Sequence, residues 1–278
     1  MATAIGSGSS NRSAPFARPG RSKVLSFDQM VAAEFVPLFL MTRDAESQPL
    51  ETHLRPAIGS GEVERVAELA VSLEAHRLLE VAESFLERGV PVESLFVDLL
   101  APAARHLGRR WEDDRLDFVD VTMGLWRLQE VLRDIAARAP RFDSGLMRGA
   151  ALFSPMPGDQ HSFGAAMMHE CFALAGWDAE MQGETTDGEL LNLVGGRAFD
   201  LLGLTLSLDA HIERAPALIR AVRSVSMNPR ICIMIGGSVC NADPTIAMLA
   251  GADGTAADAP GAVAAAERLV RAARAIAA

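Results

Sequence analysis

The sequence predicts an α/β protein in two parts, an all-α bundle of four helices followed by a parallel sheet of five strands. Two observations carry this prediction. Between residues 59 and 140, apolar residues recur every three or four positions, which is the period of amphipathic helices. In residues 148–278, short apolar runs alternate with helical runs. Strict alternation of β and α units indicates a parallel sheet with helices on both faces.

Residues 1–58 precede the bundle and differ from it in composition. Residues 1–26 are rich in Ser, Gly and Pro, and they carry four basic side chains and no acidic one, namely Arg12, Arg18, Arg21 and Lys23. This composition predicts a flexible basic N-terminal extension. We expect the rest, up to residue 58, to be a linker with one helix. The extension is either simply disordered or a docking arm for an acidic partner.

Four apolar stripes define the predicted bundle: Val63 to Leu73, Leu78 to Phe85, Leu95 to Leu107 and Val121 to Ile135. Gly89 and Pro91 predict the end of one helix and the start of the next. The segment from Gly108 to Arg115, which contains Trp111, is expected to be a turn. Four amphipathic helices with short connections favour an antiparallel bundle.

The second part contains five predicted βα units. The expected strands cover 150–154, 178–181, 200–206, 231–235 and 253–256, and the expected helices cover roughly 163–175, 187–196, 211–227, 243–250 and 258–277. This order of elements predicts a Rossmann-like, more specifically flavodoxin-like, arrangement.

Composition and charge exclude several classes of protein. The formal net charge is −10, which argues against a nucleic-acid-binding surface because phosphate contacts need clustered Lys and Arg. No apolar run approaches the length of a membrane span, and residues 1–26 lack the apolar core of a secretory signal. The cysteines Cys171, Cys232 and Cys240 fit neither a disulfide framework nor a zinc site. We expect them to be buried residues of a cytoplasmic protein.

The loop from Gly158 to Gly164 is the strongest candidate for a site. It joins a predicted strand to a predicted helix, and it contains Asp159 and His161 two positions apart. A histidine that ligates a metal commonly donates its second ring N–H to a carboxylate, which fixes its tautomer. We therefore interpret His161 as a metal ligand whose metal arrives inside a large organic cofactor. Taken alone, the same pair is also typical of a solvated loop.

Two further motifs follow predicted strands of the same sheet. Thr205 and Ser207 end the third strand, and Gly236 and Gly237 end the fourth. The carboxyl ends of parallel strands share one edge, where open α/β sheets bind ligands. Hydroxyls can bond a nitrogen base or a phosphate, and glycines allow a ligand to approach the backbone closely. Taken singly, these residues also suit a helix cap and a strand-to-helix turn.

Together the motifs resemble those of the cobalamin-binding domain family, whose pattern is D-x-H-x-x-G, then S-x-L or S-x-T, then GG. This chain has Asp159-Gln160-His161-Ser162-Phe163-Gly164, Thr205-Leu206-Ser207 and Gly236-Gly237, and its segment Gly251-Ala252-Asp253-Gly254 is similar to the last strand of the family. The middle motif departs from the family in being Thr-x-Ser. The resemblance covers nearly all of residues 148–278.

The resemblance implies that cobalamin binds with its own base detached from cobalt. His161 would then be the lower axial cobalt ligand, supported by Asp159. Thr205 and Ser207 would contact the detached base, and Gly236 and Gly237 would line the slot for the nucleotide tail. Ser162 and Gly164 complete the cofactor-binding motif around His161.

The predicted bundle resembles the helical cap that covers the upper corrin face in several cobalamin proteins. Leu107-Gly108-Arg109-Arg110-Trp111 is similar to the LG-x-x-W motif of that cap. Trp111 is therefore either close to the upper axial ligand or part of the bundle core. In B12-dependent photoreceptor regulators a Glu-His pair follows this Trp, whereas here Val121 and Thr122 stand at those positions. The adenosyl pocket of those regulators is therefore not expected.

Within the family, the chain most resembles the AerR/PpaA antirepressors of photosynthetic bacteria. That resemblance implies a light-responsive regulator, not an enzyme, which acts on a CrtJ/PpsR-type repressor without binding DNA or a membrane itself. The alternative is a corrinoid methyl carrier of a methyltransferase system, which has the same two-part layout. A flavodoxin-like signalling domain without cobalamin is a third interpretation, disfavoured by the joint spacing of the motifs.

The remaining histidines show no pattern that suggests a shared site. We expect them to be surface or structural residues: His53, His76, His106, His169 and His211.

Overall fold

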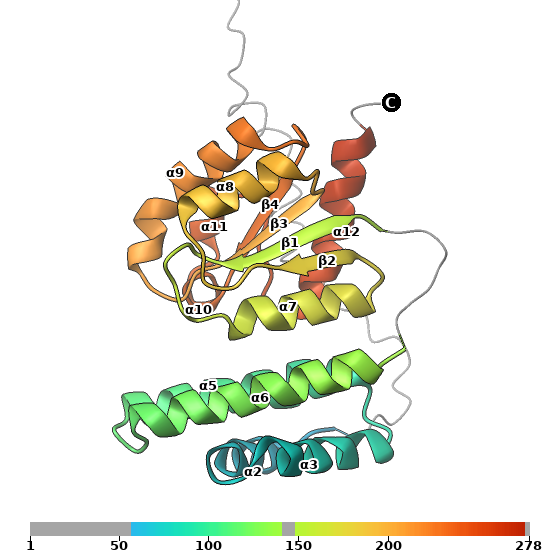
Figure 1. The fold of residues 1–278 in the computed structure, drawn as a ribbon, viewed down its shortest axis with the longest axis vertical. Helices are drawn as coiled ribbons and strands as arrows, with labels where there is room; N and C mark the ends of the chain where they lie inside the picture. The colour runs from blue at the N-terminus through green and yellow to red at the C-terminus, as the bar shows by residue number, and fades with distance from the viewer. Residues whose placement is uncertain (1–56, 141–147, 276–278) are drawn as a thin grey trace, which may run out of the picture. The chain divides into compact units, whose positions relative to one another are not determined.

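The computed structural model describes residues 57–140 and 148–275. The predicted extension and linker therefore lie outside the described residues, apart from the last two linker positions. The described chain consists of a helical bundle and a parallel sheet with helices on both faces (Figure 1), which confirms the predicted fold class.

The bundle contains four helical segments, as predicted. They are α2 (Ser60–Ser72), α3 (Ala75–Glu87), a continuous segment of α4 (Val92–Ser94), η1 (Leu95–Leu100) and α5 (Ala101–Glu112), and α6 (Phe118–Arg138). The segment η1 is one turn of π-helix. The predicted apolar stripes form the bundle core, in which Leu78, Leu99, Leu107, Leu128 and Leu132 are buried.

The third helical segment ends later than predicted. Helix α5 continues through Gly108 to Glu112, so Trp111 lies in its last turn and not in a loop. A glycine inside a helix costs only about 1 kcal/mol relative to Ala, which is too little to end a helix that buries Ala103 and Leu107. The chain turns at Asp114, whose φ of 56° is left-handed.

Arg127 of α6 is buried and ties two helices of the bundle together. Its Nη1 donates to the backbone oxygens of Ala70, at 2.9 Å, and Val71, at 2.8 Å, in the last turn of α2. The last carbonyls of a helix lack partners within it and carry partial negative charge. The guanidinium therefore satisfies the end of α2 from inside the bundle.

Within residues 57–140 and 148–275, the sheet has four strands, β1 (Ala150–Pro155), β2 (Asp178–Met181), β3 (Leu201–Thr205) and β4 (Cys232–Gly236). Their order is β2-β1-β3-β4, and all pairs are parallel.

The predicted fifth strand is reduced to a single bridge between Met234 and Gly254. The physical reason lies in Asp253. Its carboxylate accepts the backbone N–H of Ile233 at 2.6 Å and an Arg223 N–H at 2.6 Å. A side chain therefore occupies a donor of β4 that a fifth strand would otherwise use, and the ladder stays short.

In the described part of the chain, six helices accompany the sheet: α7 (Phe163–Leu174), α8 (Asp187–Gly196), α9 (Ala210–Val225), α10 (Ser238–Ala242), α11 (Thr245–Ala250) and α12 (Ala259–Ala275). Helices α7 and α12 cover one face of the sheet, and α8 and α9 cover the other (Figure 1). The predicted helix over 243–250 begins only at Thr245, because Pro244 disfavours a helical backbone at Asp243, which is extended. The Asp243 carboxylate accepts the Thr245 N–H and O–H. The short helix α10 was not predicted.

The strand order determines where the candidate site lies. Strand β1 leads into α7 on one face, whereas the neighbouring strand β3 leads into α9 on the other face. The loops that follow β1 and β3 therefore diverge from adjacent positions on one edge. Such a topological switch point is where open α/β sheets bind ligands.

None of the helices in the described ranges is both long enough and apolar enough to cross a membrane. The three cysteines are buried, as predicted. Burial raises the pKa of the Cys171 and Cys232 thiols to about 12.

Candidate functional site

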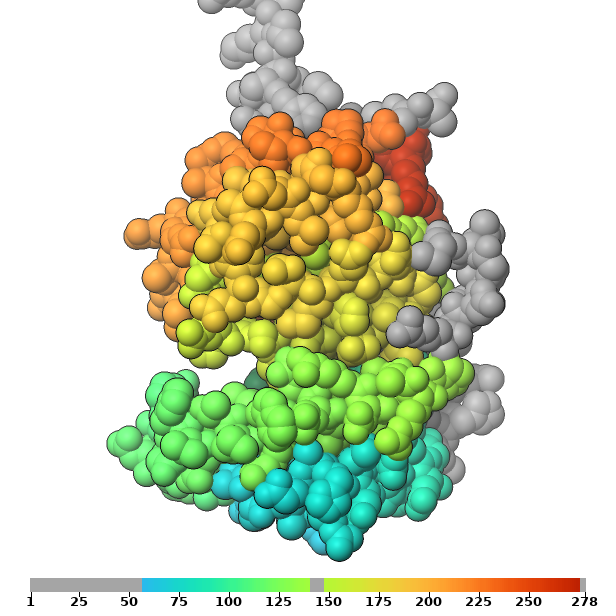
Figure 2. Space-filling model, in the orientation of Figure 1, coloured from blue at the N-terminus to red at the C-terminus, as the bar shows by residue number. Residues whose placement is uncertain are grey.

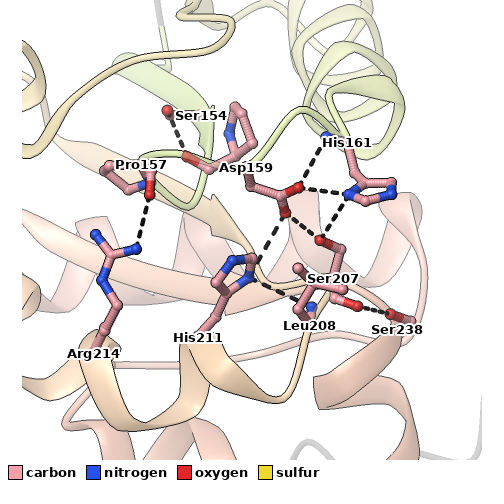
Figure 3. Close-up of polar contacts among 10 residues, drawn as sticks. Ser154, Pro157, Asp159, His161, Ser207, Leu208, His211, Arg214 and Ser238 are labelled. Atoms are coloured by element: carbon pink, nitrogen blue, oxygen red, sulfur yellow. Dashed lines mark hydrogen bonds and ion pairs between the residues drawn. The ribbon is translucent and has the colours of Figure 1, made fainter.

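A buried carboxylate and an exposed imidazole meet at the switch point (Figure 3). Asp159 Oδ1 accepts the backbone N–H of His161 at 2.9 Å and lies 2.6 Å from His161 Nδ1. Asp159 Oδ2 accepts a short hydrogen bond from the Ser207 hydroxyl. The Asp159 side chain is only 1% exposed, whereas that of His161 is 62% exposed. The His161 ring is thus exposed to solvent while the buried Asp159 carboxylate holds it.

The electrostatics of this cluster fix which ring nitrogen of His161 is available. Burial raises the pKa of Asp159, but hydrogen bonds from Ser207 and from the backbone and side chain of His161 outweigh it and lower the pKa below its usual value. Asp159 is therefore an anion at neutral pH. An anionic carboxylate only accepts, so Nδ1 of His161 carries the proton and donates. In the neutral form of the ring the lone pair then lies on the outer nitrogen, Nε2, which can coordinate a metal.

Backbone contacts hold the loop before His161. The N–H of Met156 donates to the carbonyl of Thr205 at 3.0 Å, and that of Gly158 donates to the carbonyl of Thr185 at 2.9 Å. Gly158 has a φ of 84°, a conformation that favours glycine. These bonds tie the loop after β1 to β3 and to the start of α8, so the position of Asp159 is set by the sheet.

Two buried hydroxyls near the same edge lack hydrogen-bond partners among the described residues. They belong to Thr205, at the end of β3, and to Thr255, directly after the bridge between Gly254 and β4. An unsatisfied buried polar group costs about 1–3 kcal/mol. Both hydroxyls therefore suit a polar ligand such as the nucleotide tail of a corrinoid. Thr205 was predicted as a site residue from the sequence, whereas Thr255 was predicted only as part of the strand over 253–256.

The two glycines after β4 have different environments. Gly237 has a φ of 102°, and a Cβ there would lie 2.4 Å from the carbonyl oxygen of Leu206. Among the described residues, none beyond the chain neighbours of Gly236 has an atom within 4 Å of the place where its Cβ would be. Gly237 is thus required for the backbone to pass β3, while Gly236 leaves open space. The next residue, Ser238, donates its hydroxyl to the carbonyl of Ser207 at 3.3 Å.

The remaining motif residues prepare the start of α7. Ser162 is the residue that precedes α7, and its carbonyl accepts the N–H of Ala166. A Cβ on Gly164 would lie 3.5 Å from Thr205 Cγ2, so α7 begins close to the end of β3. The structure gives Ser207 a role that the sequence did not indicate, because its hydroxyl bonds Asp159 and lies 3.4 Å from His161 Nδ1.

Trp111 belongs to the bundle, and the interpretation as a core residue is wrong, because 49% of its surface is exposed. Phe118, Met123 and Trp126 of α6 are exposed as well. The space-filling view shows α6, in bright green, at the surface (Figure 2). Thr122, at a position where the photoreceptor regulators carry the Glu-His pair, donates its hydroxyl to the carbonyl of Phe118 at 2.7 Å.

His211 was expected to be a surface or structural residue, and the structure places it beside Asp159. It is 5% exposed, and its Nδ1 lies 3.7 Å from Asp159 Oδ2. A usable signal was its position in the first turn of the helix that follows Ser207. Within the ranges described, no group of three or more His, Cys, Asp and Glu side chains could hold a metal ion.

Comparison with known proteins identifies the two parts of the chain. Residues 149–267 match the model of a family described as B12 binding domain, and residues 62–133 match a second model with the same description. An uncharacterized 20.5 kDa protein from the bchF-crtJ intergenic region of Rhodobacter capsulatus is 27% identical over 172 residues, which are 62% of this chain and 89% of that protein. The structure of the monomethylamine corrinoid protein of Methanosarcina barkeri matches with a TM-score of 0.62 at 16% identity, over 75% of this chain and 98% of that one. That likeness concerns the fold.

A helical bundle followed by a parallel sheet, with a carboxylate-backed histidine at its switch point, defines a cofactor-binding protein of the Rossmann-like class. The two family matches together cover more than half of the chain. The chain therefore belongs to the B12-binding domain family, as a cobalamin-binding protein with a helical cap domain and a Rossmann-like B12 domain.

Proposed function

We propose that this protein is a light-responsive antirepressor that holds cobalamin through His161 and acts on a CrtJ/PpsR-type transcriptional repressor without turning over a substrate. The observation that carries the cobalt-ligand part is the exposed His161 ring, whose Nδ1 is bound by a buried Asp159. The regulatory part is supported by the relative from the bchF-crtJ intergenic region, whose name places its gene beside crtJ. It is also supported by the resemblance to the AerR/PpaA antirepressors.

In this proposal, different residues would hold different parts of the cofactor. His161 would supply Nε2 to cobalt, while Asp159 holds the proton at Nδ1 and keeps the ring in the ligating tautomer. The unpartnered hydroxyls of Thr205 and Thr255 would receive polar groups of the nucleotide tail. Gly236, with open space beside its Cα, would line the tail. When bound, cobalamin would supply a cobalt ion whose bond to an alkyl ligand can be broken by light.

The output of the proposed switch is a change in the bundle. A ligand can shift a two-state element only by the difference in its affinity for the two states. The exposed side chains of Trp111, Phe118, Met123 and Trp126 are apolar groups of the cap that could respond to a changed upper ligand. The formal net charge of −10 fits a protein that regulates a DNA-binding partner without binding DNA itself.

A DNA-binding assay of the repressor tests this function. The protein is loaded with methyl-, adenosyl- or hydroxocobalamin, mixed with a CrtJ/PpsR-type repressor, and the affinity of the repressor for its operator is measured in the dark and after illumination. We expect at least one loaded form to change that affinity, with the effect absent in His161→Ala. No effect of any form on the repressor would contradict the proposal.

The second candidate is a corrinoid methyl carrier, favoured by the shared fold of the monomethylamine corrinoid protein. A methyl carrier loaded with methylcobalamin should be demethylated when a methyltransferase and its acceptor thiol are added. A regulator should keep its methyl group under those conditions in the dark.

A further inference from the structure

His211 is a buried polar side chain that the cobalt-ligand motif does not include. It lies in the first turn of α9, is 5% exposed, and directs Nδ1 toward Asp159 Oδ2 at 3.7 Å (Figure 3). The N–H of Leu208 points at the same Nδ1 at 3.4 Å. The carboxylate that anchors His161 therefore has a second imidazole on its opposite side.

The same turn of α9 holds the loop of Asp159 at another point. Arg214 lies three residues after His211, on the same side of the helix. Its Nη1 donates to the carbonyl of Pro157 at 3.1 Å, and its Nη2 donates to Asp187 Oδ1 at 3.2 Å. One helix turn thus contacts the loop both before Asp159 and at the Asp159 carboxylate. This arrangement makes α9 the support on which the anchor of His161 rests.

The consequence for Asp159 follows from what surrounds each of its oxygens. Oδ1 serves the backbone and ring of His161, and Oδ2 serves Ser207. The His211 ring directs Nδ1 to Oδ2, with which it forms an ion pair whenever the ring is protonated, a contact that a side chain without nitrogen cannot make. A carboxylate that turned toward water on that side would also change its alignment with His161 Nδ1. Groups that support a metal ligand in this indirect way typically change metal affinity about 10–100-fold when they are removed.

We propose that His211 is a positioning residue for the lower axial cobalt ligand, because it fixes the Oδ2 side of Asp159 and thereby keeps His161 in its ligating orientation. The inference rests on the proposed binding of cobalt by His161. A purely structural His211 would merely fill space at the start of α9. The two roles can be distinguished by experiment. Substitution of His211 changes the bond between His161 and cobalt in a folded protein only if His211 is a positioning residue.

The test compares three substitutions in the full chain loaded with cobalamin. His211→Leu keeps bulk and removes both nitrogens. His211→Asn places an amide group close to the position of Nδ1, and His211→Gln places it closer to that of Nε2. The matched control is His169→Leu, because His169 pairs with Glu170 on α7 and not with Asp159. The readout is the electron paramagnetic resonance spectrum of the protein reduced to Co(II), in which an axial nitrogen ligand splits the cobalt lines. Thermal unfolding of the cobalamin-free protein reports folding separately.

We expect His211→Leu to lower the ratio of His161-ligated to unligated Co(II) protein about 10-fold. His211→Asn should restore most of that ratio. His169→Leu should match the unsubstituted protein. Equal spectra for the unsubstituted protein, His211→Leu and His211→Gln would overturn the inference. If His211→Leu does not fold, a higher ligated fraction in Asn than in Gln supports the inference, and equal fractions overturn it. A missing nitrogen splitting in the unsubstituted protein would instead refute the proposed cobalt ligation itself.

Discussion

Separate substitution of the two adjacent glycines at the end of β4 distinguishes an effect on folding stability from an effect on ligand binding. Gly237→Ala would place a Cβ 2.4 Å from the carbonyl oxygen of Leu206 and 3.0 Å from its backbone nitrogen and carbon. These are backbone atoms of the chain just after β3, so no side-chain rotation can relieve the overlap. The φ of 102° adds the cost of a conformation that only glycine adopts readily, about 1–3 kcal/mol. We therefore expect a loss of about 3 kcal/mol of unfolding free energy, at the upper end of that range.

Gly236→Ala is the matched control, since no described residue beyond its chain neighbours has an atom within 4 Å of the added methyl group. At 2–4 °C for each kcal/mol, Gly237→Ala should lower the Tm of the cobalamin-free protein by about 6–12 °C. Gly236→Ala should leave that Tm unchanged but weaken cobalamin binding about 10-fold or more, if this glycine lines the tail. Thermal unfolding followed by circular dichroism and an absorbance titration with hydroxocobalamin measure the two quantities. An unchanged Tm in Gly237→Ala, or unchanged binding in Gly236→Ala, would refute the corresponding step.

Other predictions concern the anchor of His161 and the bundle. Asp159→Asn lets an amide N–H face Nδ1 of His161, which favours the tautomer with its proton on Nε2. Nε2 then has no lone pair for cobalt, so the visible spectrum of the cobalamin-loaded protein should show loss of the histidine ligand. Because the pKa of Asp159 is lowered on folding from 3.8, its ionisation stabilises the native state above that pH and the contribution is lost as the pH falls through the native pKa. The difference in unfolding free energy between the unsubstituted protein and Asp159→Asn, measured in urea, should therefore shrink on acidification. Arg127→Met should lower the unfolding free energy by about 2–3 kcal/mol, because the carbonyls of Ala70 and Val71 lose a charged donor, and a loss below about 0.5 kcal/mol in urea would contradict this.

The sequence predicts the fold because its local signals agree with its long-range pattern. The apolar periods of the bundle and the alternation of strands and helices both correspond to elements of the structure. The differences come from side chains whose partners are distant in sequence. Asp253 takes a backbone donor of β4 and limits the fifth strand, which no local pattern indicates.

The candidate site, too, was predicted from the sequence only in part. The spacing of the motifs along the chain was sufficient to predict that Asp159, His161, Thr205 and the glycine pair lie at one edge of the sheet. The reason is that the carboxyl ends of parallel strands share that edge. The bond between Ser207 and Asp159 depends on how the loops after β1 and β3 face each other. The place of His211 depends on the direction in which α9 leaves the sheet. Neither can be read from the residues of a single loop.

The central claim is that His161 binds cobalt from below, with Asp159 behind it. The most direct measurement is the electron paramagnetic resonance spectrum of the Co(II) form of the full chain and of His161→Ala. The account predicts nitrogen splitting of the cobalt lines in the unsubstituted protein and its loss in His161→Ala. A spectrum that is the same in both proteins, or a protein that retains no cobalamin, would contradict the account.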